Sequence, residues 1–140
     1  MRKLGIDYGD SRVGLAITDE LNITVQGLET VHHNGNDKLV LKRLDEILNQ
    51  YSVDTFVIGM PINMDGSKTE RVEVTEKFIH KLRCKFPKIP VETIDERLTT
   101  VAAHKTMNYR NIDNDKKRQI VDTISAVYNL ETYMNKQKNN

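Results

Sequence analysis

Hydrophobic positions in the first part of the chain alternate with polar ones at the period expected of strands. Apolar runs cover residues 3–8 and 13–17, and Gly9 between them favours a tight turn. Residues 23–31 predict a third strand, with its alternation broken at Gly27. These three segments together predict an antiparallel meander that opens with a hairpin.

The pattern then changes to helical spacing. Apolar side chains recur every three or four positions through residues 37–51, which predicts an amphipathic helix. The Asn-Gly pair at 34–35 marks a turn before it, and Asp37 is placed to cap the helix. His32 and His33 are expected in a solvated loop.

The remainder of the chain alternates strands and helices. Residues 55–59 predict a buried strand, and the preceding crossover helix makes it parallel to the first strand. A helix from Ser67 or Thr69 to Pro87 and a fifth strand over 90–94 follow. The last predicted elements are helices over about 99–108 and 116–134. The order βββαβαβαα predicts an α/β fold with a mixed sheet.

Composition limits the protein class. The 140 residues suit one domain over 1–140, with a polar tail from about residue 135. No apolar run approaches the roughly 18 residues of a membrane span, and no signal sequence is evident, so we expect a cytoplasmic protein. A single cysteine, Cys84, excludes an intrachain disulfide. The net charge of +1 permits local basic patches without indicating a nucleic-acid binder.

Three acids stand at positions that this topology could bring together. Asp7 lies inside an apolar strand, where an unpartnered charge costs several kcal/mol. Glu96 follows the fifth strand, and Asp122 lies in the last helix. Clustered carboxylates suit Mg²⁺ or Mn²⁺, and two such ions about 4 Å apart serve phosphodiester hydrolysis. The alternatives are an ion pair of Asp122 with Arg118 and a surface ion-pair turn at Glu96.

The last helix has two distinct stripes. One carries Arg118, Asp122, Ser125, Ala126 and Asn129, and the other is the apolar face of Ile120, Ile124 and Val127. Small residues beside Asp122 would let the helix pack close to the sheet and direct the acid inward.

Four stretches together resemble the YqgF, or RuvX, group of Holliday junction resolvases and pre-16S rRNA nucleases. They are residues 5–9 with 12–16, 58–61 with 63–66, 95–100, and 121–122 with 125–126 and Leu130. The resemblance implies a ribonuclease H-like fold with a five-stranded mixed sheet in the order 3-2-1-4-5, flanked by helices. It also implies a metal-binding catalytic site of Asp7, Glu96 and Asp122. Asp95 ranks below Glu96, because adjacent strand residues point to opposite faces.

Basic residues near this site are candidate contacts to a phosphate backbone. They are Arg12, Lys68, Arg71, Arg97, Lys116, Lys117 and Arg118. Arg97 has the alternative role of orienting an acid through a bidentate pair. Few aromatic residues are present, so recognition is expected to rest on backbone shape rather than on base stacking.

The first functional hypothesis is a metal-dependent endonuclease, a hydrolase that processes the 5′ end of pre-16S rRNA in ribosome biogenesis or cuts branched DNA. Its expected partners are nucleic acid and the ribosome. A monomer would suffice for rRNA, whereas junction resolution would need a homodimer. The alternatives are a non-catalytic nucleic-acid or ribosome-associated module and an actin-like kinase or ATPase. The chain length argues against the last of these, because such enzymes enclose a nucleotide between two lobes.

Overall fold

The computed structural model describes residues 1–61, 70–95 and 114–138, with side chains described except at 114–122 and 138. The strands are β1 (Arg2–Tyr8), β2 (Arg12–Thr18), β3 (Val25–His32), β4 (Val53–Met60) and β5 (Val91–Asp95). The helices are α1 (Asp37–Gln50), α2 (Glu70–Lys85) and α4 (Asn114–Lys138). The helix expected over about 99–108 lies outside the described residues.

The strands form one five-stranded sheet in the order β3-β2-β1-β4-β5. β1, β2 and β3 pair antiparallel, so the expected meander is confirmed. β4 pairs parallel with both β1 and β5, because α1 and α2 return the chain to the starting edge. The mixed sheet and its strand order are therefore as expected.

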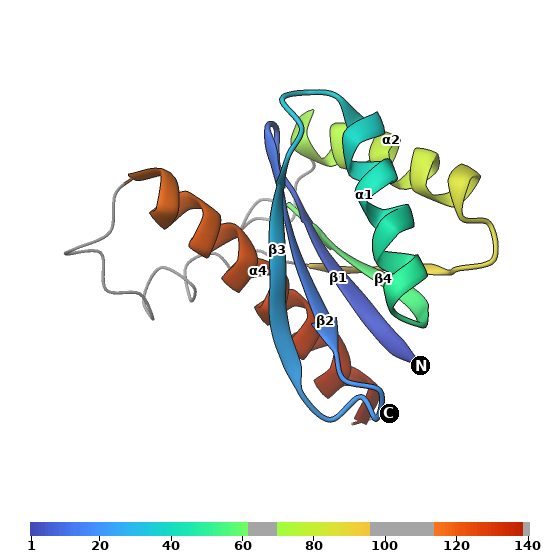
Figure 1. Cartoon of the computed structure of the whole chain (residues 1–140). Helices are drawn as coiled ribbons and strands as arrows, with labels where there is room; N and C mark the ends of the chain where they lie inside the picture. Colours follow the sequence, from blue (N-terminus) through green and yellow to red (C-terminus); the bar gives the residue numbers. More distant parts are fainter. Residues whose placement is uncertain (62–69, 96–113, 139–140) are drawn as a thin grey trace.

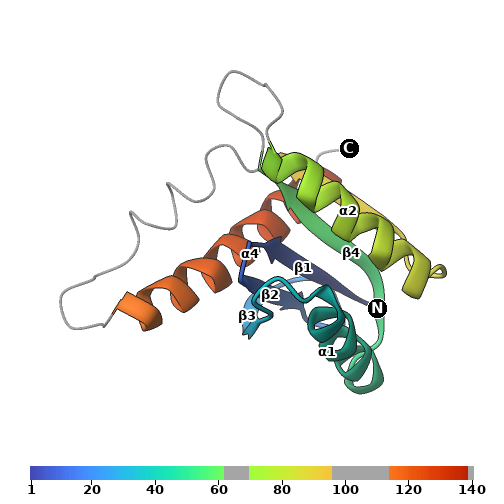
Figure 2. The same cartoon turned by 90° about the horizontal axis from the view of Figure 1, so that it is seen from above.

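Helices cover both faces of this sheet. Figures 1 and 2 show α1 and α2 on one face and α4 on the other. Leu4, Ile6 and Tyr8 of β1 belong to the core under α1 and α2. The smaller core under α4 consists of Ala16, Val57, Ile94, Ala126 and Leu130. Within the described part of the chain, no helix is long and apolar enough to span a membrane.

α4 packs on the sheet through its stripe of small residues. Ser125, Ala126 and Asn129 are buried, whereas Ile124 and Val127 are only half-buried. The expectation that small residues let this helix pack close to the sheet is therefore confirmed. The close approach is possible because Gly5 of β1 lacks a side chain, and a Cβ there would lie 3.0 Å from Leu130 Cβ and 3.1 Å from the Ala126 carbonyl oxygen.

The loop between β3 and α1 also differs from expectation. Asn36, not Asp37, caps α1, because its side-chain oxygen accepts a 3.1 Å hydrogen bond from the Lys38 amide. Asp37 instead accepts hydrogen bonds from the Tyr8 hydroxyl at 2.5 Å and from Lys81 at 2.9 Å. His32 is exposed as expected, but His33 is buried with 1% of its surface accessible.

Candidate active site

The carboxyl ends of β1, β4 and β5 meet at one edge of the sheet, because these three strands are parallel. The turn from β1 to β2 lies at the same edge. Gly9 closes this turn with a 2.9 Å hydrogen bond from its amide to the Arg12 carbonyl. A Cβ at position 9 would lie 2.7 Å from that carbonyl oxygen, so the turn requires glycine. In open α/β sheets this edge is where ligands commonly bind.

Asp7 lies on the α4 face of the sheet, one residue before the end of β1. Its neighbours Ile6 and Tyr8 point into the core under α1 and α2, while Gly5 abuts α4. Since successive strand residues alternate between faces, Asp7 shares the face of Gly5. Its side chain is half-buried. The hairpin therefore holds one carboxylate at the sheet edge, facing α4.

Strand register connects Asp7 to α4. Asp7 pairs with Gly14 of β2, and Gly14 pairs with Thr30 of β3. The Thr30 hydroxyl forms a 3.0 Å hydrogen bond with the hydroxyl of Thr123 on α4. Thr123 of α4 thus contacts β3 in the row that contains Asp7, whereas over β1 the helix packs on Gly5 through Ala126 and Leu130. Residue 122 adjoins Thr123 in the chain.

Gly27 of β3 fixes the same contact from the neighbouring row. A Cβ at position 27 would overlap Thr123 Cγ2, so the threonine methyl occupies a notch that only glycine leaves open. The threonine hydroxyl is meanwhile held by Thr30. These two contacts set the height and rotation of α4 beside Asp7. Sequence reasoning missed both threonines, because neither residue signals a site without strand pairing.

The two other predicted acids are only partly described. Glu96 lies outside the described residues, and of Asp122 the backbone alone is described, within α4. Among the side chains that the structure describes, no group of three metal-ligating residues occurs. Asp95 is exposed at the end of β5. Ile94 before it belongs to the core under α4, so Asp95 points to the face opposite Asp7.

Among the predicted basic residues whose side chains the structure describes, Arg12 shares a face with Asp7. It is half-buried at the start of β2, in alternation with Gly14 and Ala16 on the α4 face. Across the strands it pairs with His32 of β3, which is exposed. His32 therefore lies close to the site, and the strand pairing that places it there was not evident in the sequence.

Arg71 reaches the same sheet edge from the opposite side. In the first turn of α2, its guanidinium lies 3.5 Å from the Asp10 carboxylate and 3.5 Å from the Tyr8 carbonyl oxygen. Its side chain remains half exposed. Arg71 thus contacts the β1–β2 turn, on the face away from α4.

The other predicted basic residues are less completely described. Lys68 and Arg97 lie outside the described residues. Lys116, Lys117 and Arg118 belong to the first turns of α4, although their side chains are not described. Figures 1 and 2 show that these turns project beyond the sheet. The backbone thus extends a basic segment away from the core.

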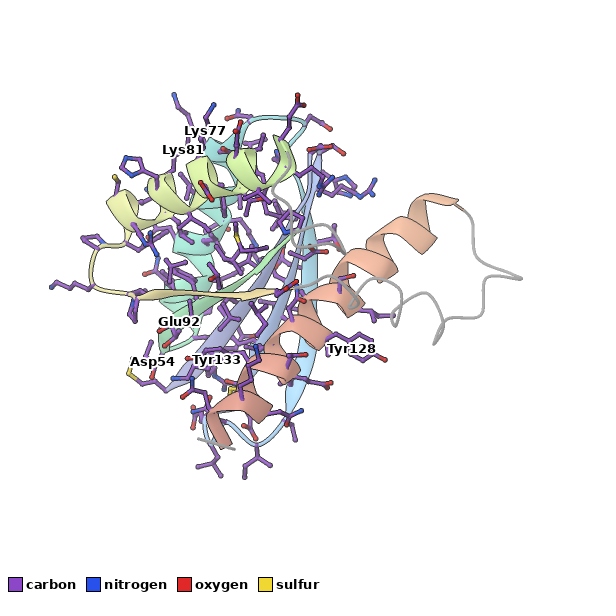
Figure 3. The ribbon with its side chains drawn as sticks, turned by 180° about the vertical axis from the view of Figure 1, so that it is seen from behind. Asp54, Lys77, Lys81, Glu92, Tyr128 and Tyr133 are labelled. Atoms are coloured by element: carbon purple, nitrogen blue, oxygen red, sulfur yellow. The ribbon has the colours of Figure 1, made fainter. Side chains whose placement is uncertain are left out.

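A separate charged cluster lies at the other end of β1 and β4. Lys3 donates a 2.7 Å hydrogen bond to Asp54, and Figure 3 shows Tyr133 of α4 near Asp54 and Glu92. Burial favours a higher pKa for Asp54, but hydrogen bonds from Lys3 and Thr55 outweigh it and lower the pKa. Burial chiefly raises the pKa of Tyr133. This cluster connects β1, β4 and α4 far from Asp7.

Solved structures share the fold of this chain. The RuvC structure of Thermus thermophilus superposes with a TM-score of 0.58 at 12% identity, covering 99% of this chain and 97% of that one. The Fowlpox virus Holliday junction resolvase gives a TM-score of 0.55 at 17% identity, covering 97% and 99%. The fold is therefore ribonuclease H-like, of the type found in these resolvases.

Relatives in sequence identify the family. A family model described as "RuvX: Holliday junction resolvase" matches residues 1–136. A protein of Ruminiclostridium cellulolyticum named "Putative pre-16S rRNA nuclease" is 51% identical over 136 residues, covering 97% of this chain and 95% of its own. One of the same name from Acetivibrio thermocellus is 48% identical over 134 residues, covering 96% and 95%. The chain belongs to the RuvX family.

Proposed function

We propose that the protein is a divalent-metal-dependent endonuclease that processes the 5′ end of pre-16S rRNA. The observation that carries the proposal is the row of Asp7, Gly14 and Thr30, on which Thr123 seats α4. This row supports a site in which Asp7 and Asp122 come close together. In the sequence, Glu96 directly follows Asp95, the last residue of β5, and the carboxyl end of β5 lies at the same sheet edge as that of β1. The names of the relatives support the rRNA substrate.

The donor chemistry of these residues fits hard divalent cations. Asp7 is a half-buried carboxylate on a central strand, where a cation would offset its desolvation. Asp7, Glu96 and Asp122 would hold one or two Mg²⁺ or Mn²⁺ ions through oxygen ligands. Bound ions would supply water activation and stabilisation of the leaving oxygen.

The remaining groups would orient the substrate. Arg12 lies on the face of Asp7 and presents a guanidinium that suits a phosphodiester oxygen. In the hydrolysis, the oxygen of a water molecule bonds to phosphorus and gives up one proton to solvent, the bond from phosphorus to the leaving oxygen breaks, and the leaving oxygen takes up a proton from solvent. The basic first turns of α4 would contact the flanking backbone, which predicts binding that weakens with salt.

The first test is cleavage by the Asp7→Asn variant. Losing one carboxylate ligand should lower Mg²⁺- or Mn²⁺-dependent cleavage of an RNA carrying the 16S 5′ leader by at least about a hundredfold. Asp45→Asn is the matched control, since Asp45 is exposed on α1 on the opposite face. Circular dichroism should show that both variants fold. Undiminished cleavage by Asp7→Asn would refute the assignment.

A second candidate function is Holliday junction resolution, which the description of the family model favours. The same preparation should therefore be assayed in parallel on the RNA and on a four-way DNA junction. Light scattering would give the oligomeric state of the same preparation. Faster cleavage of the junction than of the RNA, by a protein that is a dimer, would favour junction resolution, since two strands must be cut symmetrically. Binding of both substrates without cleavage in any divalent metal would favour a non-catalytic module.

A further inference from the structure

The loop after β3 is hydrogen-bonded to the β1–β2 turn beside the candidate site. The backbone amides of His33 and Asn34 both donate to the Ser11 carbonyl, at 2.9 and 3.2 Å. The imidazole of His33 reaches further and lies 2.9 Å from the Gly9 carbonyl oxygen through Nε2. Two carbonyls of the turn are therefore held by a loop more than twenty residues further along the chain.

The partners of the ring determine its tautomer. The Gly35 amide can only donate, and it lies 3.0 Å from His33 Nδ1. Nδ1 must therefore accept with its lone pair. Gly9 offers only a carbonyl oxygen, so Nε2 carries the hydrogen and donates. Both ring nitrogens are satisfied, which is consistent with the 1% exposure of the residue.

Aromatic stacking fixes the direction of the ring. Tyr8 stacks on His33 with ring centroids 5.5 Å apart, and Phe78 stacks on Tyr8 at 4.4 Å. The Tyr8 hydroxyl is in turn held by Asp37, which also accepts from Lys81. The imidazole thus stacks on the Tyr8 ring and is hydrogen-bonded both to the β1–β2 turn and to its own loop after β3. It cannot rotate without losing both hydrogen bonds.

We propose that His33 is a positioning residue for the candidate active site, acting through the Nε2–H bond to the Gly9 carbonyl. This bond fixes the Gly9–Asp10 peptide, which lies in the turn just after β1. Asp7 and Arg12 lie two and three residues to either side of Gly9. Their relative placement therefore depends on the orientation of this peptide. The proposal rests on the proposed nuclease function.

Three substitutions separate the two roles of the ring. In His33→Asn, the amide oxygen can replace Nδ1 as acceptor for Gly35, but the side chain is too short to reach Gly9. In His33→Gln, the longer side chain can donate to the Gly9 carbonyl as Nε2 does. In His33→Phe, the stacking on Tyr8 is retained and both hydrogen bonds are lost. His80→Asn is the matched control, because His80 is exposed on α2.

We expect the His33→Asn and His33→Gln variants to differ in turnover number but not in substrate binding. At saturating RNA, kcat should fall about tenfold or more in His33→Asn and His33→Phe, since a misplaced catalytic group costs rate. His33→Gln should recover to within about threefold of the wild type, because the net hydrogen-bond energy is largely restored. KM should change little in any of them. Equal kcat in Asn and Gln, or activity that only follows the melting temperature, would overturn the proposal.

Nuclear magnetic resonance tests the same contact without any cleavage. The ¹⁵N shifts of the His33 ring should report hydrogen on Nε2 alone, and the Gly9 carbonyl shift should change in His33→Asn but not in His33→Gln. Hydrogen on Nδ1, or a Gly9 shift that is indifferent to both variants, would overturn the proposal. If the wild type cleaves no substrate while these shifts appear as expected, the nuclease assignment fails and the contact to the turn stands.

Discussion

Replacing Gly27 by alanine should test how tightly α4 is seated on the sheet. The new Cβ would lie closer than 3.0 Å to Thr123 Cγ2, a separation that real Cβ atoms essentially never show. Thr123 cannot simply rotate away, because a β-branched side chain has few rotamers and its hydroxyl is held by Thr30. The helix or the strand must therefore shift.

The sign of the effect follows from two opposing magnitudes. Gly→Ala at a permissive backbone stabilises by about 0.4–1 kcal/mol through the unfolded state. Overpacking by a methyl group costs about 1–3 kcal/mol. The steric term is larger, so Gly27→Ala should lower the free energy of unfolding by about 1–2 kcal/mol. At this chain length that corresponds to a loss of roughly 2–4 °C in melting temperature per kcal/mol.

Urea unfolding of a double-mutant cycle measures the effect. Thr123→Ser removes Cγ2 but keeps the hydroxyl for Thr30, so it should restore most of the stability lost in Gly27→Ala, with a coupling of about 1–2 kcal/mol. Thr132→Ser is the control on the same helix, because Thr132 is exposed and its hydroxyl donates a 2.7 Å hydrogen bond to the Tyr128 carbonyl within α4. Figure 3 shows Tyr128 directed away from the sheet. If Gly27→Ala is stabilising, or if both serine variants rescue equally, the seating of α4 through Thr123 is wrong.

Two further predictions concern the acid–tyrosine contact and Asp95. Burial and the hydrogen bond to Asp37 raise the pKa of Tyr8 above its ordinary value near 10, so the folded state keeps a proton that the unfolded state releases at high pH. Stability from this group is full below pH about 10 and falls as the pH rises above it. Tyr8→Phe should cost about 1.5–3 kcal/mol at neutral pH and flatten that alkaline decline, which urea unfolding from pH 8 to 11 would detect; parallel alkaline declines would contradict the assignment. Asp95→Asn should retain metal-dependent cleavage while Glu96→Gln loses at least about a hundredfold, and an equal loss in both would place Asp95 in the site as well.

Much of the architecture followed from local sequence pattern. The alternation before residue 32 and the 3.6-residue period of 37–51 predicted the meander and α1 to within a few residues. The crossover argument made β4 parallel to β1, and the family resemblance supplied the strand order. These succeed because the period of apolar residues reflects which face of an element is buried.

The roles of individual polar residues were set by tertiary structure. Asp37 is at the start of α1 as predicted, but its carboxylate accepts hydrogen bonds from the Tyr8 hydroxyl and Lys81. Asn36 therefore caps the helix instead. The two adjacent histidines look alike in sequence, yet His32 is exposed whereas His33 is buried, with a carbonyl and an amide that satisfy both of its ring nitrogens. Such partners come from distant segments, and no local period encodes them.

The sequence by itself determined that a charge, Asp7, stands in a central strand beside a glycine-closed turn. Tertiary structure decided which face that charge occupies and what crosses it. Asp7 faces α4 because Ile6 and Tyr8 are taken by the opposite core. Thr123 of α4 meets β3 at this row because Thr30 bonds to its hydroxyl and Gly27, in the neighbouring row, leaves room for its methyl group. The pattern of a strand shows that its successive side chains alternate between two faces. Which of those faces contacts α4 is decided only by how this helix, from the far end of the chain, packs on the sheet.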